Sequence, residues 1–208
     1  MRWLVPLLLT GLMGTWAQAQ DGWQQVDEVE GPGAHTLFRR QLPDARVAAF
    51  RLEGLVDAPI ARVLAAQRAE PKQAAEDGKG PRRRLLRQEG EVSVTYTYMP
   101  VPLLADRDLV LRQEHSQDPA TGIHRFVWHT VEGEGPPPPE GVVRIQRSEG
   151  MWEFTPQGDS RTRLVLESLT DAGGSLPAWV VNSFYPRELR REWNGLIARI
   201  RDPVPPRP

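Results

Sequence analysis

Two arginines, Arg107 beside Asp108 and Arg144 inside an apolar strand, are candidates to contact the polar group of a ligand. A guanidinium carries five N–H donors and binds anionic or hydroxyl oxygens. Arg107 precedes Asp108, and adjacent strand residues point to opposite faces, so at most one of this pair can face an interior. A buried Arg144 would need an acidic partner, for which Glu167 is a candidate. The alternative is a structural role in tying neighbouring loops together.

Aromatic side chains form a second set of candidates. Their default interpretation is an ordinary hydrophobic core, and if the interior holds a cavity the same rings would line it. The set comprises Tyr96, Tyr98, Phe126, Trp128, Trp152 and Trp179.

Neither catalysis nor metal binding is indicated. The four histidines (His35, His115, His124 and His129) lack a metal-ligand spacing such as H-E-x-x-H, and the chain has no cysteine. No serine lies in a G-x-S-x-G motif. We therefore predict no catalytic residue, no metal and no cofactor.

The elements that must position these residues are mostly strands. The segment Val92–Met99 alternates most clearly, with Val92, Val94, Tyr96 and Tyr98 on one face. Turn-rich connections between short strands predict a mainly antiparallel sheet built from hairpins. Gly22–Glu30 fits either a strand or a helical turn, and further strands are expected at residues 36–40, 45–53, 108–115, 123–131, 142–147, 151–154 and 162–169.

Two helices are expected. A short one covers Ile60–Gln67, with Asp57 as its N-cap and Pro59 in its first turn. A long amphipathic one follows Gly173 and Gly174, with Ser175 as a possible cap, and Pro186 should bend or break it. Its apolar stripe, which must lie against the sheet, is Ala178, Val181, Tyr185, Leu189, Trp193, Leu196 and Ile200.

The run Arg82-Arg83-Arg84 opens the strand that precedes Val92. It fits either a basic patch for anionic headgroups or a solvated strand edge, and the edge is the simpler interpretation.

The N-terminus predicts export. Arg2, the apolar run Leu4–Met13 and the small-x-small triplet Ala17-Gln18-Ala19 are typical of a signal peptide cleaved after Ala19. An apolar run of about ten residues is too short to span a bilayer. Residues 1–19 would be the signal peptide, residues 20–202 one folded domain and residues 203–208 a disordered Pro-rich tail. The expected location is the periplasm or the exterior, and a net charge of −1 gives no reason to expect nucleic acid.

Several motifs in order along the chain resemble a START (steroidogenic acute regulatory protein-related lipid transfer) domain of the helix-grip superfamily. The most specific is the turn Asp171–Asn182, which is similar to the family's entry into its C-terminal lid helix. The others are Trp23, Val56–Pro59, Tyr98–Pro102, Arg107–Val110, Val143-Arg144, Trp152–Pro156 and Thr162. Two features depart from the family pattern: Ala69–Arg84 is short and lacks a tryptophan-containing stretch, and Ala172 stands where proline is usual.

The resemblance implies an α+β helix-grip fold: a curved antiparallel sheet around a long C-terminal helix, with an internal hydrophobic cavity for one lipid. The expected function is to bind a lipid, sterol or fatty-acyl compound for transport or storage, as a monomer with transient membrane contact. The alternatives are an enzyme of the same superfamily, cyclase or hydrolase-like, and an envelope module whose cavity is filled by side chains. The expected cavity residues are Tyr96, Tyr98, Arg107, Phe126, Trp128, Arg144, Trp152, Trp179, Val181, Tyr185 and Leu189.

Overall fold

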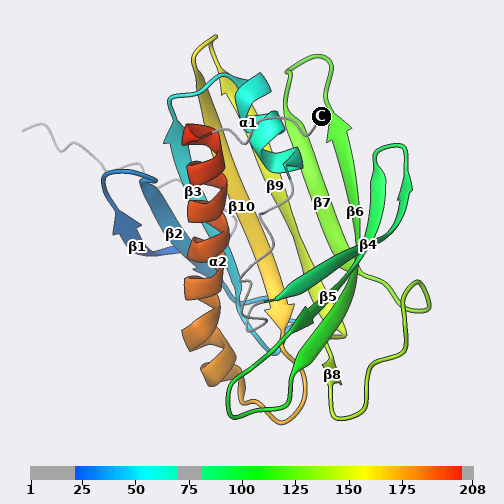
Figure 1. Ribbon diagram of the computed structural model, residues 1–208. Coiled ribbons are helices and arrows are strands. Elements are labelled where there is room, and N and C mark those ends of the chain that lie inside the picture. The colour runs from blue at the N-terminus through cyan, green and yellow to red at the C-terminus, as the bar shows by residue number, and fades with distance from the viewer. Residues whose placement is uncertain (1–21, 70–80, 203–208) are drawn as a thin grey trace, which may run out of the picture.

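The computed structural model describes residues 22–69 and 81–202, in which ten strands form one sheet (Figure 1). Residues 1–19, expected to be a signal peptide, the expected tail 203–208 and most of the segment 69–84 lie outside the described residues. The strands are β1 (Gln24–Val29), β2 (His35–Arg40), β3 (Ala49–Val56), β4 (Arg82–Glu89), β5 (Val92–Met99), β6 (Arg107–Gln117), β7 (His124–Thr130), β8 (Val143–Arg144), β9 (Arg147–Gln157) and β10 (Arg161–Asp171).

The sheet is antiparallel along its whole path, in the order β1-β2-β3-β10-β9-β7-β6-β5-β4. Only β8, a two-residue strand beside β6, runs parallel to its neighbour within the described chain. The antiparallel sheet expected from the turn-rich sequence is confirmed. Gly22–Glu30 proves to be a strand, and the expected strand at 142–147 divides between β8 and the start of β9.

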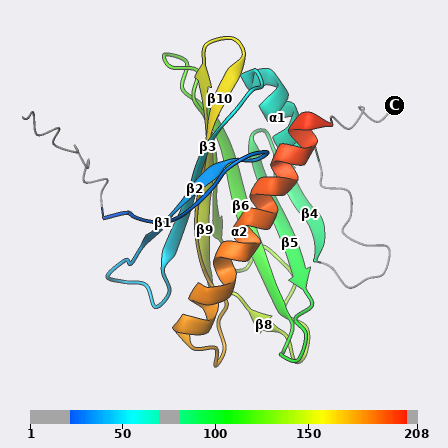
Figure 2. The ribbon, with the colours of Figure 1, turned by 90° about the vertical axis from the view of Figure 1, so that its left-hand side faces the viewer.

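The C-terminal helix α2 (Ala178–Arg201) lies against one face of this sheet, and the sheet curves around it (Figure 2). We call this face the inner face and the opposite one the outer face. Helix α2 packs mainly on β3, β10 and α1 (Ile60–Arg68). The expected apolar stripe is confirmed, because Val181, Leu189, Trp193, Leu196 and Ile200 are all buried.

The helix caps differ from the sequence expectation. The N-caps are Pro59 and Pro177, and neither helix has a side-chain cap; α1 begins at Ile60, as expected, and α2 begins at Ala178. Asp57 and Ser175 therefore do not cap, since each lies two residues before the N-cap. Pro186 does not break α2, which is continuous to Arg201.

Carbonyl groups at the C-terminal end of each helix accept hydrogen bonds from an arginine of the other helix. Arg62 of α1 donates from Nε to the Ile200 carbonyl at 2.6 Å and from Nη2 to the Arg201 carbonyl at 2.7 Å. Arg199 of α2 donates to the Ala66 carbonyl at 2.9 Å. Cationic donors at helix C-termini satisfy carbonyls that have no partner within the helix. These contacts fix α1 against the last turn of α2.

The core lies between α2 and the inner face. One cross-strand row runs through Leu52, Leu166, Trp152 and Phe126 on β3, β10, β9 and β7. All four side chains belong to the same buried cluster as Leu189, Trp193 and Leu196 of α2. Because side chains alternate between faces, this row identifies which residues of each neighbouring strand face α2.

Candidate ligand-binding site

Aromatic side chains cover the centre of the inner face. Phe126 and Trp128 on β7 and Trp152 on β9 are all buried. Gly150 is in register with Trp128, and a Cβ at Gly150 would clash with the Trp128 ring and with the Glu167 carbonyl. The absence of a side chain there lets the indole lie against the sheet.

Helix α2 is joined to this aromatic surface by Trp152. Its ring stacks on Trp193 with centroids 5.6 Å apart and 23° between the planes. Its Nε1 donates a hydrogen bond of 3.1 Å to Glu192 of the same helix. Trp152 therefore makes both an apolar and a polar contact with α2, as buried tryptophans commonly do.

Four hydroxyl groups gather beside these rings. Tyr185 Oη lies 2.6 Å from Ser168 Oγ and 2.8 Å from Thr170 Oγ1, and Thr170 Oγ1 lies 2.8 Å from Ser148 Oγ. Desolvation of the phenol raises the pKa of Tyr185 to about 12. The hydroxyl cluster is therefore neutral across the physiological range. Sequence reasoning missed Ser148, Ser168 and Thr170, although each alternates with outward-facing residues of its strand.

Arg107 is buried on the inner face, at the start of β6. Only 5% of the residue is exposed, and it alternates with the core residues Leu109 and Leu111. Its Nη1 donates to the Ala105 carbonyl, and its buried Nε has no hydrogen-bond partner among the described residues. A Cβ placed on Gly174 would lie 4.0 Å from Arg107 Nη2. The guanidinium thus lies beneath the glycine turn that leads into α2.

Asp108 and Arg144 form an ion pair on the outer face. Arg144 donates from Nε and Nη2 to the two Asp108 oxygens at 2.7 and 2.9 Å, and Asp108 is fully buried. The pair confirms that only one member of Arg107-Asp108 faces inward. It also corrects two expectations: Arg144 does not line the inner face, and its partner is not Glu167, which pairs with Arg51 at 2.5 Å.

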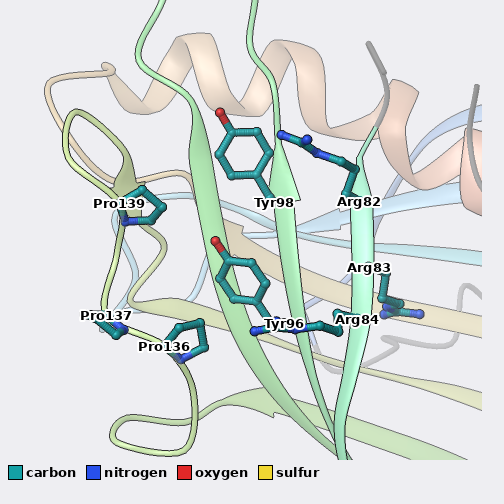
Figure 3. A pocket seen from close by; sticks show the side chains of 8 residues that line it. All are labelled: Arg82, Arg83, Arg84, Tyr96, Tyr98, Pro136, Pro137 and Pro139. Carbon is teal, nitrogen blue, oxygen red and sulfur yellow. The ribbon is translucent and has the colours of Figure 1, made fainter. Parts of the chain in front are cut away.

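Tyr96 and Tyr98 also lie on the outer face, contrary to the expectation that they line an interior cavity. They are in register with Val110 and Asp108, which face away from α2. Both rings line a hollow of about 510 Å³ on the outside of the sheet (Figure 3). The alternation of Val92–Met99 is as expected, but its apolar and aromatic side faces outward.

Of the four cavity residues expected on α2, three face the sheet and one, Trp179, faces solvent. Val181 and Leu189 are buried and Tyr185 reaches the hydroxyl cluster, whereas Trp179 is 71% exposed. At 100° per residue, Trp179 lies about 200° from Val181 and so points away from the sheet. Trp179 therefore does not join the inner aromatic residues.

A second hollow, of about 360 Å³, lies beside the first half of α2. It is bounded by α2 on one side and by the inner-face residues Leu37, Arg39 and Phe50 on the other. Its remaining lining residues are Val26, Trp179, Asn182, Ser183 and Pro186.

Among titratable groups, His115 and His124 form a pair at the far end of the inner face. Their rings stack at 5.3 Å, His115 Nε2 lies 3.0 Å from His124 Nδ1, and His115 Nδ1 lies 2.5 Å from Glu91 Oε2. Burial lowers the pKa of His124. Neither histidine lines either hollow, and residues 22–69 and 81–202 contain no metal-binding group of three or more His, Cys, Asp or Glu side chains.

The family of the chain follows from its comparison with known proteins. A family model described as START domain matches residues 9–204. The chain belongs to the START domain family. An uncharacterized protein of Pseudomonas aeruginosa is 30% identical over 103 residues, which are 49% of this chain and 50% of that protein. The match thus spans about half the length of that relative.

Solved START structures share the fold. A STAR-related lipid transfer protein fragment from Xanthomonas axonopodis has a TM-score of 0.73 and 21% identity, covering 88% of this chain and all of that one. Human StAR-related lipid transfer protein 5 has a TM-score of 0.72 and 22% identity, covering 88% of each chain. These similarities confirm the α+β helix-grip fold, in which a curved antiparallel sheet surrounds the C-terminal helix. None of the helices in the described part of this START domain is long and apolar enough to cross a membrane.

Proposed function

We propose that this START domain binds one hydrophobic molecule, a lipid, sterol or fatty-acyl compound, between α2 and the inner face, and carries or stores it outside the cytoplasm. Family membership supports binding of a hydrophobic ligand, and the names of both solved relatives contain lipid transfer. The observation that carries the proposal is the burial of Arg107 with its Nε unpaired.

A buried guanidinium loses its hydration and is costly unless its donors find acceptors. Arg107 has one hydrogen bond, to Ala105, and its neighbours on the inner face are Leu109 of β6 and Met99 of β5. A ligand headgroup or hydroxyl next to Arg107 would satisfy the remaining donors. Arg107 would then orient a ligand whose binding energy comes mainly from apolar burial, at about 25 cal/mol per Å².

The half of the inner face formed by β5 and β6 is the part that α2 leaves uncovered. Helix α2 packs on β3 and β10 instead, so the inner-facing Thr95, Thr97 and Gln113 remain partly exposed. The hollow of about 360 Å³ lies on the other flank of α2 and opens to solvent, so it is separate from this half of the inner face.

Exposed apolar residues indicate where a ligand would enter. Leu103 and Leu104 project from the loop between β5 and β6, and Trp179 and Phe184 project from the first half of α2. Figures 1 and 2 place this loop and the start of α2 at the same end of the molecule. Transient contact of this end with a bilayer would cover these side chains while α2 or the loop opens.

Export and a monomeric state complete the proposal. Export is supported by the signal-like segment 1–19, and the absence of cysteine excludes a lipid-modified cysteine at the cleavage site. Mass spectrometry of the mature protein from fractionated cells tests export. A periplasmic chain beginning at Gln20 is the expected result, and a cytoplasmic chain that retains residues 1–19 would contradict it.

The enzyme alternative predicts a buried acid/base or histidine pair that converges on the interior. His129 and Glu167 are the residues singled out for such a pair, and the structure does not place either of them there. His129 is exposed, and Glu167 pairs with Arg51 on the outer face. The His115–His124 pair is the remaining candidate, and turnover of a hydrophobic substrate that is abolished in His124→Gln would favour this alternative.

The test of binding uses the inner-face tryptophans as energy donors. A dansyl-labelled fatty acid held between α2 and the sheet lies near Trp128, Trp152 and Trp193, so its emission should rise under tryptophan excitation. Saturation at one ligand per chain is expected. Replacing Thr97 by Trp would fill the inner face of β5 and should abolish uptake, whereas Ser116→Trp on the exposed end of β6 should not. Equal uptake by both variants would place the ligand elsewhere.

A further inference from the structure

The outer-face hollow is a second site, separated from the inner face by the sheet itself. Its volume is about 510 Å³, and it lies between the edge strand β4 and the proline-rich loop before β8 (Figure 3). Its lining combines three arginines, two tyrosines and three prolines: Arg82, Arg83, Arg84, Tyr96, Tyr98, Pro136, Pro137 and Pro139.

Hydrogen bonds hold Tyr98 at the base of this hollow, and the two carboxylates near it, Asp106 and Asp108, already have hydrogen-bond partners. Tyr98 donates its hydroxyl to Asp106, which also accepts a hydrogen bond of 2.9 Å from the Val101 N–H. These bonds lower the pKa of Asp106. Asp108, beneath Tyr96, holds Arg144 through two hydrogen bonds. Both carboxylates thus have other hydrogen-bond partners, and Asp106 attracts Arg82 without forming an ion pair with it.

Arg82 and Arg84 form that rim. They are in register with Tyr98 and Tyr96, and their guanidinium carbons lie 4.7 and 5.8 Å from the centres of the two rings. No carboxylate of the described residues lies within ion-pair distance of either arginine. Stacking on a ring uses the face of a guanidinium and leaves its N–H edge open, which is the geometry that binds phosphate oxygens.

The site adjoins the loop that carries the exposed leucines. Asp106 links Tyr98 to Val101, and the Leu104 N–H donates to the Val101 carbonyl at 3.3 Å. Leu103 is fully exposed and has a φ of 66°, a left-handed conformation that is strained for a leucine. A strained, outward-pointing apolar side chain beside unpaired arginines is suited to the boundary between bilayer and water.

We propose that the Arg82–Arg84 rim binds the phosphoryl groups of anionic phospholipids at a membrane surface while Leu103 and Leu104 enter the bilayer. This proposal rests on the proposed function in one respect: a protein that carries a lipid must contact a membrane. The whole chain carries a net charge of −1, so general attraction to an anionic surface is not expected and a local cationic site is needed. The site would select the donor or acceptor membrane and leave the inner face to select the ligand.

The test is vesicle sedimentation at low salt with the full mature chain, comparing phosphatidylcholine vesicles with vesicles that also contain phosphatidylglycerol. The double variant R82Q/R84Q should bind the anionic vesicles about 30-fold more weakly, because each arginine near such a surface contributes about fivefold. The matched control is R161Q/R201Q, which removes the same charge from exposed residues at the start of β10 and the end of α2. Figure 1 places these two element ends opposite the start of α2. The control should retain most of the binding.

Three outcomes would overturn the proposal. The first is equal vesicle binding by R82Q/R84Q and wild type, as for a solvated strand edge. The second is equal loss in both double variants, which would indicate net charge alone. The third is equally tight binding of glycerol phosphate without vesicles, which would indicate a soluble ligand.

Loading with the dansyl fatty acid distinguishes this proposal from the proposed function. R82Q/R84Q should load as wild type does and melt at a similar temperature. A wild-type chain that binds anionic vesicles but loads no hydrophobic ligand would leave the membrane site intact and refute the carrier function.

Discussion

Trp152 of β9 and Trp193 of α2 stack with ring centroids 5.6 Å apart, and both side chains are almost fully buried. This contact holds the middle of α2 on the inner face. The hydroxyl cluster around Tyr185 and the glycine turn above Arg107 lie towards its beginning. The helix is thus fixed at its centre and its C-terminal end, while its first turns carry exposed Trp179 and Phe184.

Replacing Trp193 by alanine should lower the free energy of unfolding by about 3–5 kcal/mol, since it removes a large buried ring and leaves a cavity. The matched control is Trp179→Ala on the same helix, whose ring is 71% exposed and should contribute less than about 0.5 kcal/mol. Urea denaturation followed by circular dichroism measures both. Similar losses in the two variants would show that α2 is not held by this stack.

The buried Arg107 and the partly buried Arg144 should respond oppositely to replacement by methionine. Arg107→Met should reduce affinity for an acyl ligand by about tenfold or more, because a charged hydrogen-bond donor to the ligand is lost. Its free energy of unfolding should change little, since an incompletely paired buried charge is replaced by an apolar chain. Arg144→Met should instead destabilise the fold by about 3 kcal/mol, because Asp108 is left buried without its partner.

Ligand titration and urea denaturation of the two variants separate these effects. A loss of stability in Arg107→Met with unchanged affinity would make Arg107 a structural residue.

Acid should weaken the entry into α2. Asp171 binds Arg46 Nε at 3.0 Å and accepts a 3.0 Å bond from the Gly173 N–H, and the bond from Arg46 is the main reason that its pKa is lowered. A lowered pKa in the folded state means that the pair stabilises fully above the unfolded value of about 3.9 and is lost as pH falls through the folded value. The pair is half-exposed on its arginine side, so it should contribute only about 1 kcal/mol at neutral pH.

The measurement is the unfolding free energy of wild type and Asp171→Asn between pH 7 and pH 2. The difference should be constant down to about pH 4 and then close. A difference that persists unchanged in acid would show that it does not arise from the ionised carboxylate.

Pro186 should control ligand exchange. It lies inside a continuous α2, where it offers no N–H to the Asn182 carbonyl, while the Asn182 side chain accepts a bond of 2.9 Å from the Ala48 N–H. Pro186→Ala restores the missing donor, so release of a bound dansyl fatty acid should slow more than stability changes. Stopped-flow release rates test this, and equal rates in variant and parent would remove Pro186 from the opening motion.

Much of the fold could be predicted from sequence because its signals are local. Alternation in Val92–Met99 and the stripe from Val181 to Ile200 reflect burial of one side of each element, and both are confirmed. The helix caps could not be predicted in this way. The polar residues Asp57 and Ser175 are of types that cap helices, but Pro59 and Pro177 occupy the N-cap positions.

The site was harder to predict, for a physical reason. Alternation shows which residues share a face, but it does not show which face meets α2. Tyr96 and Tyr98 share a face with Val94, which is buried on the outer side. Trp179 was excluded from the apolar stripe by its helical position, and its aromatic character alone suggested a buried role. The partner of Arg144 required the register of β8 with β6, which no local pattern encodes.

The central claim, that a hydrophobic molecule binds between α2 and the inner face, is tested most directly by native mass spectrometry of protein purified from its own host, followed by solvent extraction. The expected result is one bound lipid-sized ligand per chain, lost or reduced in Arg107→Met. A consistently empty protein that also takes up nothing from a panel of lipids, sterols and fatty acids would contradict it.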